Sequence, residues 1–128
     1  MSHIFCQDNG IWTMTDGTTY QGWSGNNEAG QDENNPDAQN IKGHGPIDRG
    51  LYTIVGPIDP PDHLGPFAFH LVPDADNDMG GRGGFCLHGE EAAHPELSSD
   101  GCIIQQRPAR EAIGAAVAAG DNRLQVVA

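Results

Sequence analysis

The sequence predicts a small, mostly β domain: a sandwich or barrel with one short C-terminal helix. Eighteen glycines and nine prolines among 128 residues indicate many turns between short strands. Several short segments have the residue pattern of strands, and only one segment near the C-terminus has helical composition. A chain of this length can form one core, and no repeat or linker divides it. We therefore expect a single domain over residues 1–128.

The first expected strands form a hairpin. In IWTMTDGTTYQGW (residues 11–23), two β-rich arms flank Asp16 and Gly17, a pair typical of a tight turn. The next segment, Ser24–Asn40, has almost no apolar residue, so we expect a long loop that contributes little to a core and is functional or mobile. A turn at GPIDRG then leads into an expected strand, Leu51–Val55.

The second half of the chain is expected to hold further strands and the helix. Phe67–Val72 alternates large apolar residues with Ala68 and His70, and we expect His70 to be a satisfied core or interface histidine. GFCLH, CII and LQVV are also predicted strands. The predicted helix is RPAREAIGAAVAAG, because Pro108 suits a first helical turn, alanine favours helix and Gly120 suits the end.

The charge of the chain narrows the classes of partner. Eighteen acidic residues against six basic ones give a net charge of −12, which disfavours nucleic acids and anionic membranes and suits a basic partner. The sequence has no apolar stretch of the roughly 20 residues that a membrane span needs. The first residues, MSHIFCQDNGIW, lack the features of a signal peptide, so we expect synthesis in the cytoplasm without one.

A histidine and a cysteine are candidates for one active site. His88 ends an expected strand, and Cys102 follows Gly101 at the start of another. A histidine within reach can accept the proton of a thiol nucleophile, and amides at a glycine turn can bind an oxyanion. If the two strands are neighbours, the loop between them brings both side chains together. The alternative is two ordinary core residues, because cysteine is often buried and the spacing alone is weak evidence. With three cysteines in the chain, at least one thiol stays free unless it bonds to another chain.

Motifs around this pair occur in a specific order. The segment HGEEAAHPELSSDGCI has His-Gly followed after a loop by Ser-Asp-Gly-Cys, and GPIDRGLYTI, GPFAFHLVP and GRGGFCLHG precede it or overlap with it. This order resembles the YkuD-type L,D-transpeptidases, in which Ser-His-Gly-Cys follows His-Gly; here Asp100 stands where that second histidine would be. With an acidic residue at this position, the sequence resembles one branch of that superfamily: the small L,D-transpeptidase-like effectors that type VI secretion systems deliver into rival bacteria. The resemblance covers most of the chain.

The resemblance implies a cysteine enzyme that acts on peptidoglycan stem peptides and needs no cofactor. Cys102 would attack the carbonyl of diaminopimelate at stem position three and expel D-alanine, with His88 as the general base. Water would then complete an L,D-carboxypeptidase reaction, and an amine would give L,D-transpeptidase exchange. Ser99, Asp100 and Gly101 would shape the nucleophile loop. Asp100 would either orient His88 or simply cap the turn.

The same resemblance implies that the protein acts outside the cell that produces it. A delivery component of the secretion system would carry the protein into the periplasm of target bacteria. A periplasmic immunity protein would protect sister cells by covering the cleft. Its contact would include the polar segment Ser24–Asn40, because a loop at a rim can be gripped without disturbing the core.

Other residues have a functional and a structural interpretation. Arg82 could bind substrate carboxylates, or form an ion pair in an acidic protein. Tyr52 and Trp23 could line a groove, although packing is the commoner role of such residues. DADNDMG (residues 74–80) imitates a calcium loop without its glycine and final glutamate.

Two rival functions stay open. One is a metal-dependent peptidase, although the spacing of the candidate ligands is not that of a zinc site. Those candidates are His44, His63, His70, His88, His94 and Cys102. The other rival is a non-catalytic wall-binding module on the same fold.

Overall fold

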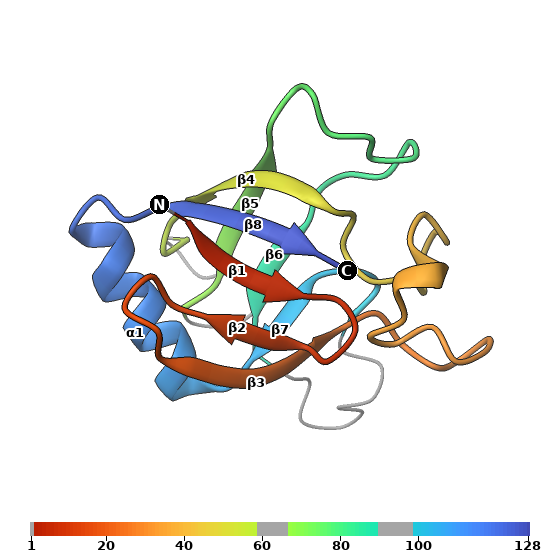
Figure 1. The fold of residues 1–128 in the computed structure, drawn as a ribbon, viewed down its shortest axis with the longest axis horizontal. Helices are drawn as coiled ribbons and strands as arrows, with labels where there is room; N and C mark the ends of the chain where they lie inside the picture. The colour runs from red at the N-terminus through yellow and green to blue at the C-terminus, as the bar shows by residue number, and fades with distance from the viewer. Residues whose placement is uncertain (1, 59–66, 90–98) are drawn as a thin grey trace.

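The chain folds into a closed β-barrel with one helix at its end (Figure 1). The computed structural model describes residues 2–58, 67–89 and 99–128. The strands of the barrel are β1 (His3–Cys6), β2 (Ile11–Thr13), β3 (Thr19–Ser24), β4 (Gly50–Val55), β5 (Phe69–Pro73), β6 (Cys86–His88), β7 (Ile103–Gln105) and β8 (Arg123–Val127). They close in the order β1-β2-β3-β7-β6-β5-β4-β8. The expected mostly β architecture is confirmed, as a barrel.

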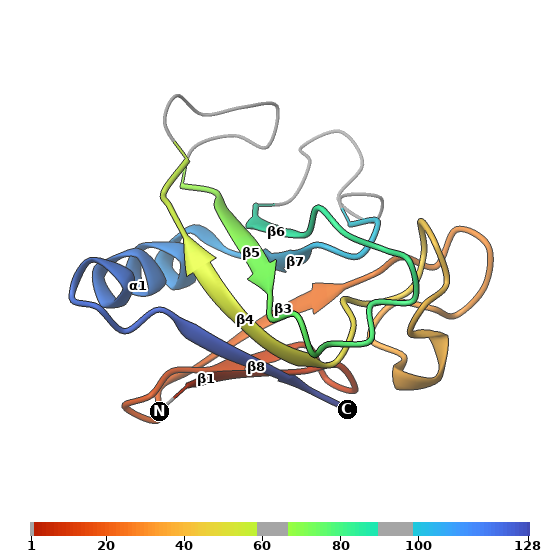
Figure 2. The ribbon, with the colours of Figure 1, turned by 90° about the horizontal axis from the view of Figure 1, so that it is seen from above.

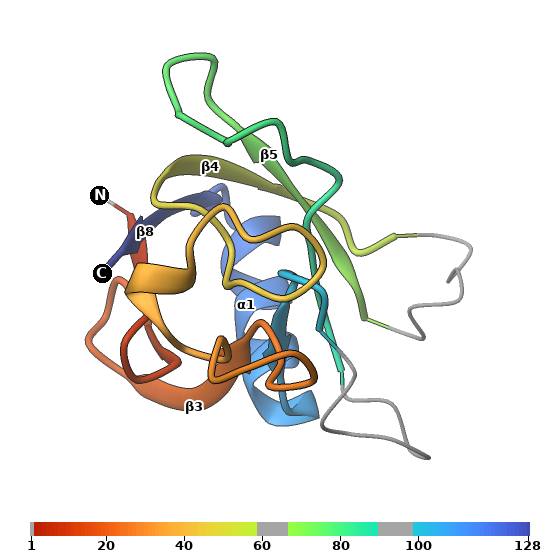
Figure 3. The same cartoon turned by 90° about the vertical axis from the view of Figure 1, so that its right-hand side faces the viewer.

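Helix α1 (Arg107–Ala118) covers one end of the barrel. Ala109 and Ile113 are buried, and Ile113 belongs to the barrel core. The loops between β3 and β4, with the 3-10 helix η1 (Pro36–Ala38), lie at the opposite end (Figures 1 and 3). The predicted helix is confirmed at both ends, because Pro108 lies in its first turn and Gly120, with φ +93°, follows its last residues.

The interior is filled by large side chains from nearly every strand. Alternation along each strand sends one residue inward and the next outward. The buried core cluster is Phe5, Trp12, Met14, Ile47, Tyr52, Ile54, Phe69, Leu71, Phe85, Leu87, Ile103, Ile113, Leu124 and Val126. Closure of the sheet lets these short strands bury their inner faces without leaving an open edge.

The hairpin is confirmed, whereas the first strand and part of the long loop differ from expectation. Strands β2 and β3 are antiparallel around Asp16 and Gly17, and Gly17 has φ +93°. Strand β1, which the sequence did not predict, pairs with β2 and also with β8. The polar segment after β3 buries Asn26 and Ala38 at 1% and 2% exposure, so parts of it are built into the domain.

Strands β6 and β7 are parallel neighbours, which is the condition for the expected active site (Figure 2). Leu87 lies opposite Ile103 in the register, and both belong to the core. Alternation therefore sends Cys86 and His88 to the outer face of β6, and Cys102 to the same face at the start of β7. No helix in the described part of the chain is long and apolar enough to cross a membrane.

Candidate active site

His88 is held in one tautomer by the backbone. Its Nδ1 lies 2.7 Å from the carbonyl oxygen of Gly89, and the ring is only 7% exposed. A carbonyl only accepts hydrogen bonds, so Nδ1 must carry the proton and donate it. In the neutral ring, Nε2 is then the nitrogen without a proton. This is the tautomer that a general base acting through Nε2 requires.

Cys102 is a half-buried thiol at the start of β7. Its Sγ accepts a hydrogen bond from the backbone N–H of Cys86 at 3.2 Å. The neighbouring Cys86 side chain, burial and the negative charge of Asp100 together raise the pKa of Cys102, and the Cys86 N–H only partly offsets them. At neutral pH the resting group is thus a thiol, which requires a base at the moment of attack.

Ser99 organises the nucleophile loop, which we define as residues 99–102. Its hydroxyl donates to the carbonyl of Cys102 and accepts hydrogen bonds from the N–H groups of Gly25 and Gly101, at 2.8 and 3.1 Å. Ser99 is fully buried. One side chain thereby closes the loop on itself and joins it to the segment that follows β3.

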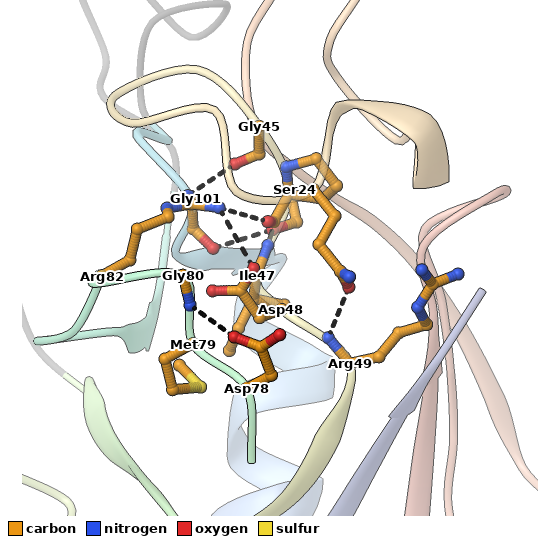
Figure 4. A network of polar contacts seen from close by, with 12 residues as sticks. Ser24, Gly45, Ile47, Asp48, Arg49, Asp78, Met79, Gly80, Arg82 and Gly101 are labelled. Carbon is orange, nitrogen blue, oxygen red and sulfur yellow. Dashed lines mark hydrogen bonds and ion pairs between the residues drawn. The ribbon is translucent and has the colours of Figure 1, made fainter.

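Two further carbonyls of the nucleophile loop are bound by side chains from the same distant segment. The Ser24 hydroxyl donates to the carbonyl of Gly101 at 2.8 Å and accepts from the N–H of Ile47 (Figure 4). The Asn26 amide donates to the carbonyl of Ser99 at 2.8 Å. Both side chains are buried, so these bonds are sheltered from water.

Arg82 binds the remaining loop carbonyl and is a structural clamp. Its guanidinium donates to the carbonyls of Pro46 at 2.9 Å, Gly45 at 2.9 Å and Asp100 at 3.2 Å. It also lies 3.7 Å from the carboxylate of fully buried Asp48 (Figure 4). The Arg82 side chain is 5% exposed, so it does not offer its charge to a substrate as the sequence suggested.

Gly101 fits a place that no other residue could occupy without strain. Its φ is +135°, and a Cβ there would lie 2.4 Å from both Arg82 Nη2 and the Phe85 ring. The turn that exposes Cys102 therefore depends on a glycine pressed against the Arg82 clamp.

Tyr52 is a core residue, which corrects its suggested role in substrate binding. Its side chain is 0% exposed, and its hydroxyl donates to the carbonyl of Asp48 at 2.6 Å. Burial and the charge of Asp48 raise the pKa of Tyr52, so it remains a neutral donor. Trp23, the other aromatic residue considered, is half-buried on β3.

One polar residue next to the nucleophile loop, Asn26, was not predicted. Asn26 accepts a hydrogen bond from the N–H of Glu28, and its Oδ1 also lies 2.8 Å from His44 Nδ1. Its amide donates to Gly43 as well as to the nucleophile loop. In the sequence, Asn26 lies in a Ser-Gly-Asn run at the start of a polar segment. This pattern does not indicate that the asparagine is buried.

The described residues give no support to a metal site. No three His, Cys, Asp or Glu side chains in residues 2–58, 67–89 and 99–128 come together as a metal would require. In the calcium-like segment, Asp74 forms a paired contact with Arg123 at 2.7 and 3.0 Å. His63 and His94 lie outside the described residues.

One hollow in the described part of the chain is lined by residues other than Cys102 and His88. It measures about 650 Å³ and is lined by Asp8, Asn27, Gly30, Gln31, Glu33, Asn34, Asn35 and Pro36. None of these residues belongs to the nucleophile loop or to β6. The candidate site is therefore the outer face of β6 and β7 and not this hollow.

Replacing Arg82 should destabilise the fold. Arg82→Met keeps the length of the side chain but leaves Asp48 buried without its cation, which should lower the free energy of unfolding by about 3–5 kcal/mol. Denaturant unfolding measures the change. Arg49→Met, at an exposed neighbouring position, should stay within about 0.5 kcal/mol. Adding Asp48→Asn to Arg82→Met should recover part of the loss; equal stability of Arg82→Met and the wild type would contradict the clamp.

Removing the charge of Asp100 should make Cys102 easier to ionise. Asp100 raises the pKa of Cys102, so Asp100→Asn should move the pH profile of Cys102 alkylation by iodoacetamide toward lower pH. Labelled peptides are quantified by mass spectrometry. Asp76→Asn, which removes an equal charge at another exposed position, should leave the profile in place. A profile that moves to higher pH in Asp100→Asn would contradict the electrostatic account.

Comparison with known proteins identifies the family. The model of the Tlde1 domain matches residues 18–128, which include β3 to β8 and the whole candidate site. No curated protein and no solved structure gave a significant match to the chain. Since the family model covers most of the sequence, the chain belongs to the Tlde1-domain family of antibacterial type VI secretion effectors.

Proposed function

We propose that this effector is a cysteine L,D-carboxypeptidase and L,D-transpeptidase that acts on peptidoglycan stem peptides. The observation that carries the proposal is the pairing of β6 and β7, which puts Cys102 and His88 on one outer face, together with the backbone bond that leaves His88 Nε2 as a base. Family membership makes the protein an effector secreted into target cells. The cysteine chemistry and the wall substrate are our proposal.

The first step is attack by Cys102. His88 Nε2 accepts the thiol proton as Sγ bonds to the carbonyl carbon of the residue at stem position three. The carbonyl oxygen becomes an oxyanion. The Cys86 N–H, which contacts Sγ at 3.2 Å, stabilises negative charge on the sulfur before the bond forms.

The nucleophile loop supports the oxyanion through its orientation. The carbonyl of Gly101 points inward to the Ser24 hydroxyl. In a trans peptide the N–H of the next residue points the opposite way, so the Cys102 N–H is directed away from Ser24. An amide directed outward beside the nucleophile is the kind of donor that stabilises a tetrahedral intermediate.

The second half of the reaction releases the products. Collapse of the intermediate breaks the bond to D-alanine, whose amine takes the proton back from His88, and a thioester on Cys102 remains. Water then gives the shortened stem and free thiol, or an amine gives an exchanged stem. Mass spectrometry of the muropeptides distinguishes the two outcomes.

Removal of the Cys102 sulfur should abolish the reaction. Purified Cys102→Ala should lower turnover of muropeptides by several orders of magnitude, because a covalent mechanism loses its nucleophile. Cys6→Ala, which removes a thiol from β1, should react like the wild type. Mass spectrometry follows the stems, and circular dichroism verifies the fold. Normal cleavage by folded Cys102→Ala would end the proposal, and wall binding without cleavage by the wild type would favour the binding module.

We also propose a periplasmic immunity protein that covers the Cys102 site. The net charge of −12 favours a basic contact face and fast association. Expression of the effector with an added export signal should stop growth of a sensitive bacterium, and co-expression of the adjacent gene product should restore it. Cys102→Ala is the control. Harmless export of the wild type without the neighbour would contradict the toxin's action in the periplasm.

A further inference from the structure

A row of three sulfur and nitrogen side chains crosses β5, β6 and β7 on the outer face of the barrel. His70 lies opposite Cys86 in the antiparallel register of β5 and β6. Leu87 lies opposite Ile103 in the parallel register of β6 and β7, so Cys86 and Cys102 occupy the preceding position on each strand. Because paired positions face the same side of a sheet, the two cysteines lie side by side.

The contacts between the two cysteines agree with this register. The N–H of Cys86 reaches Cys102 Sγ at 3.2 Å, and neither cysteine is in a disulfide. Neighbouring strands lie about 4.8 Å apart. That spacing falls within the Cα separation of about 4.4–6.8 Å that a disulfide spans. The spacing of the two positions is therefore compatible with a disulfide.

A base lies on the far side of Cys86. Nδ1 of His70 is 3.6 Å from Cys86 Sγ, and the His70 side chain is exposed on β5. His70 is therefore not a core histidine: it faces outward and contacts a thiol. An imidazole at this distance can accept the proton of Cys86 and increase its reactivity as a thiolate.

We propose that Cys86 is the resolving partner of Cys102, so that an oxidised nucleophile is captured as a reversible Cys86–Cys102 disulfide. A peroxide first converts the Cys102 thiol into a sulfenic acid, and the peroxide is reduced to water or an alcohol. Cys86 then attacks the sulfenic sulfur, its proton passes to His70, and hydroxide leaves, which becomes water with that proton. A dithiol reductant restores both thiols and is itself oxidised.

This pair would protect the half-buried nucleophile outside the reducing cytoplasm. A lone sulfenic acid is open to further oxidation, which is irreversible, whereas a disulfide can be reduced again. Only this consequence for activity depends on the proposed function of Cys102. The formation of the disulfide itself depends on the geometry of β6 and β7.

Peptide mapping after peroxide treatment tests the proposal. The reduced wild-type protein is treated with hydrogen peroxide, alkylated, digested and analysed by mass spectrometry. We expect one internal disulfide joining Cys86 to Cys102, reversed by dithiothreitol, with Cys6 still alkylated. Cys6→Ser should give the same bond. In Cys86→Ser, Cys102 should instead carry a sulfenic acid that reacts with dimedone. At a higher peroxide concentration, Cys102 should gain two or three oxygens, as a sulfinic or sulfonic acid, which dithiothreitol does not remove.

Each outcome bears on the proposal. Wild-type protein in which Cys102 gains oxygens while Cys86 stays alkylated would overturn it, and this result does not depend on whether a variant folds. An unchanged rate of disulfide formation in His70→Ala would remove His70 from the mechanism. The mapping uses no peptidoglycan, so it is independent of the proposed enzyme activity. If the disulfide forms but the reduced protein does not cleave stem peptides, only the proposed enzyme function is wrong. If the protein cleaves stem peptides but forms no disulfide, only the proposed redox role of Cys86 is wrong.

Discussion

Four successive backbone carbonyls, those of residues 99–102, are bound by side chains, and the site depends on these bonds. Asn26, Arg82, Ser24 and Ser99 donate to them in turn. Three of these donors come from segments far away in the sequence. An irregular turn cannot satisfy its own carbonyls as a strand does, so its shape must be fixed by such donors. The position of Cys102 is thus a property of the whole domain, and only its exposure comes from the local Gly-Cys sequence.

The electrostatics of the site follow from this construction. Arg82 is one of six basic residues in the chain, but its charge is directed to three carbonyls and to Asp48. It therefore gives little help to a thiolate. In the mechanism we propose, the raised pKa of Cys102 makes a base necessary, and that base is His88. The tautomer of His88 is set by the carbonyl of the next residue. A thiol that is protonated at rest is consistent with general-base catalysis in the mechanism we propose.

The sequence predicted those features that depend on neighbouring residues. The hairpin at Asp16 and Gly17, the helix after Pro108 and the strands on either side of the active site are encoded in local turn residues and patterns. For Arg82 and Tyr52 the sequence left a binding role and a structural role open. It could not decide between them, because burial depends on which distant segments fold against a residue. The same holds for Asn26: in the sequence it is one polar residue of a polar loop, and only tertiary contacts make it a buried donor.

The backbone and the side chain of Asp100 have separate roles. The L,D-transpeptidase pattern that the sequence resembles has a histidine at this position. The backbone carbonyl of Asp100 accepts from Arg82, while its side chain is exposed. The hydrogen bond that fixes this position therefore uses the backbone carbonyl, and every residue type has that group. The side chain is left free to set the charge beside the nucleophile, and an aspartate raises the pKa of Cys102. An acidic residue at this position thus tunes the thiol toward its protonated form without disturbing the turn that presents it.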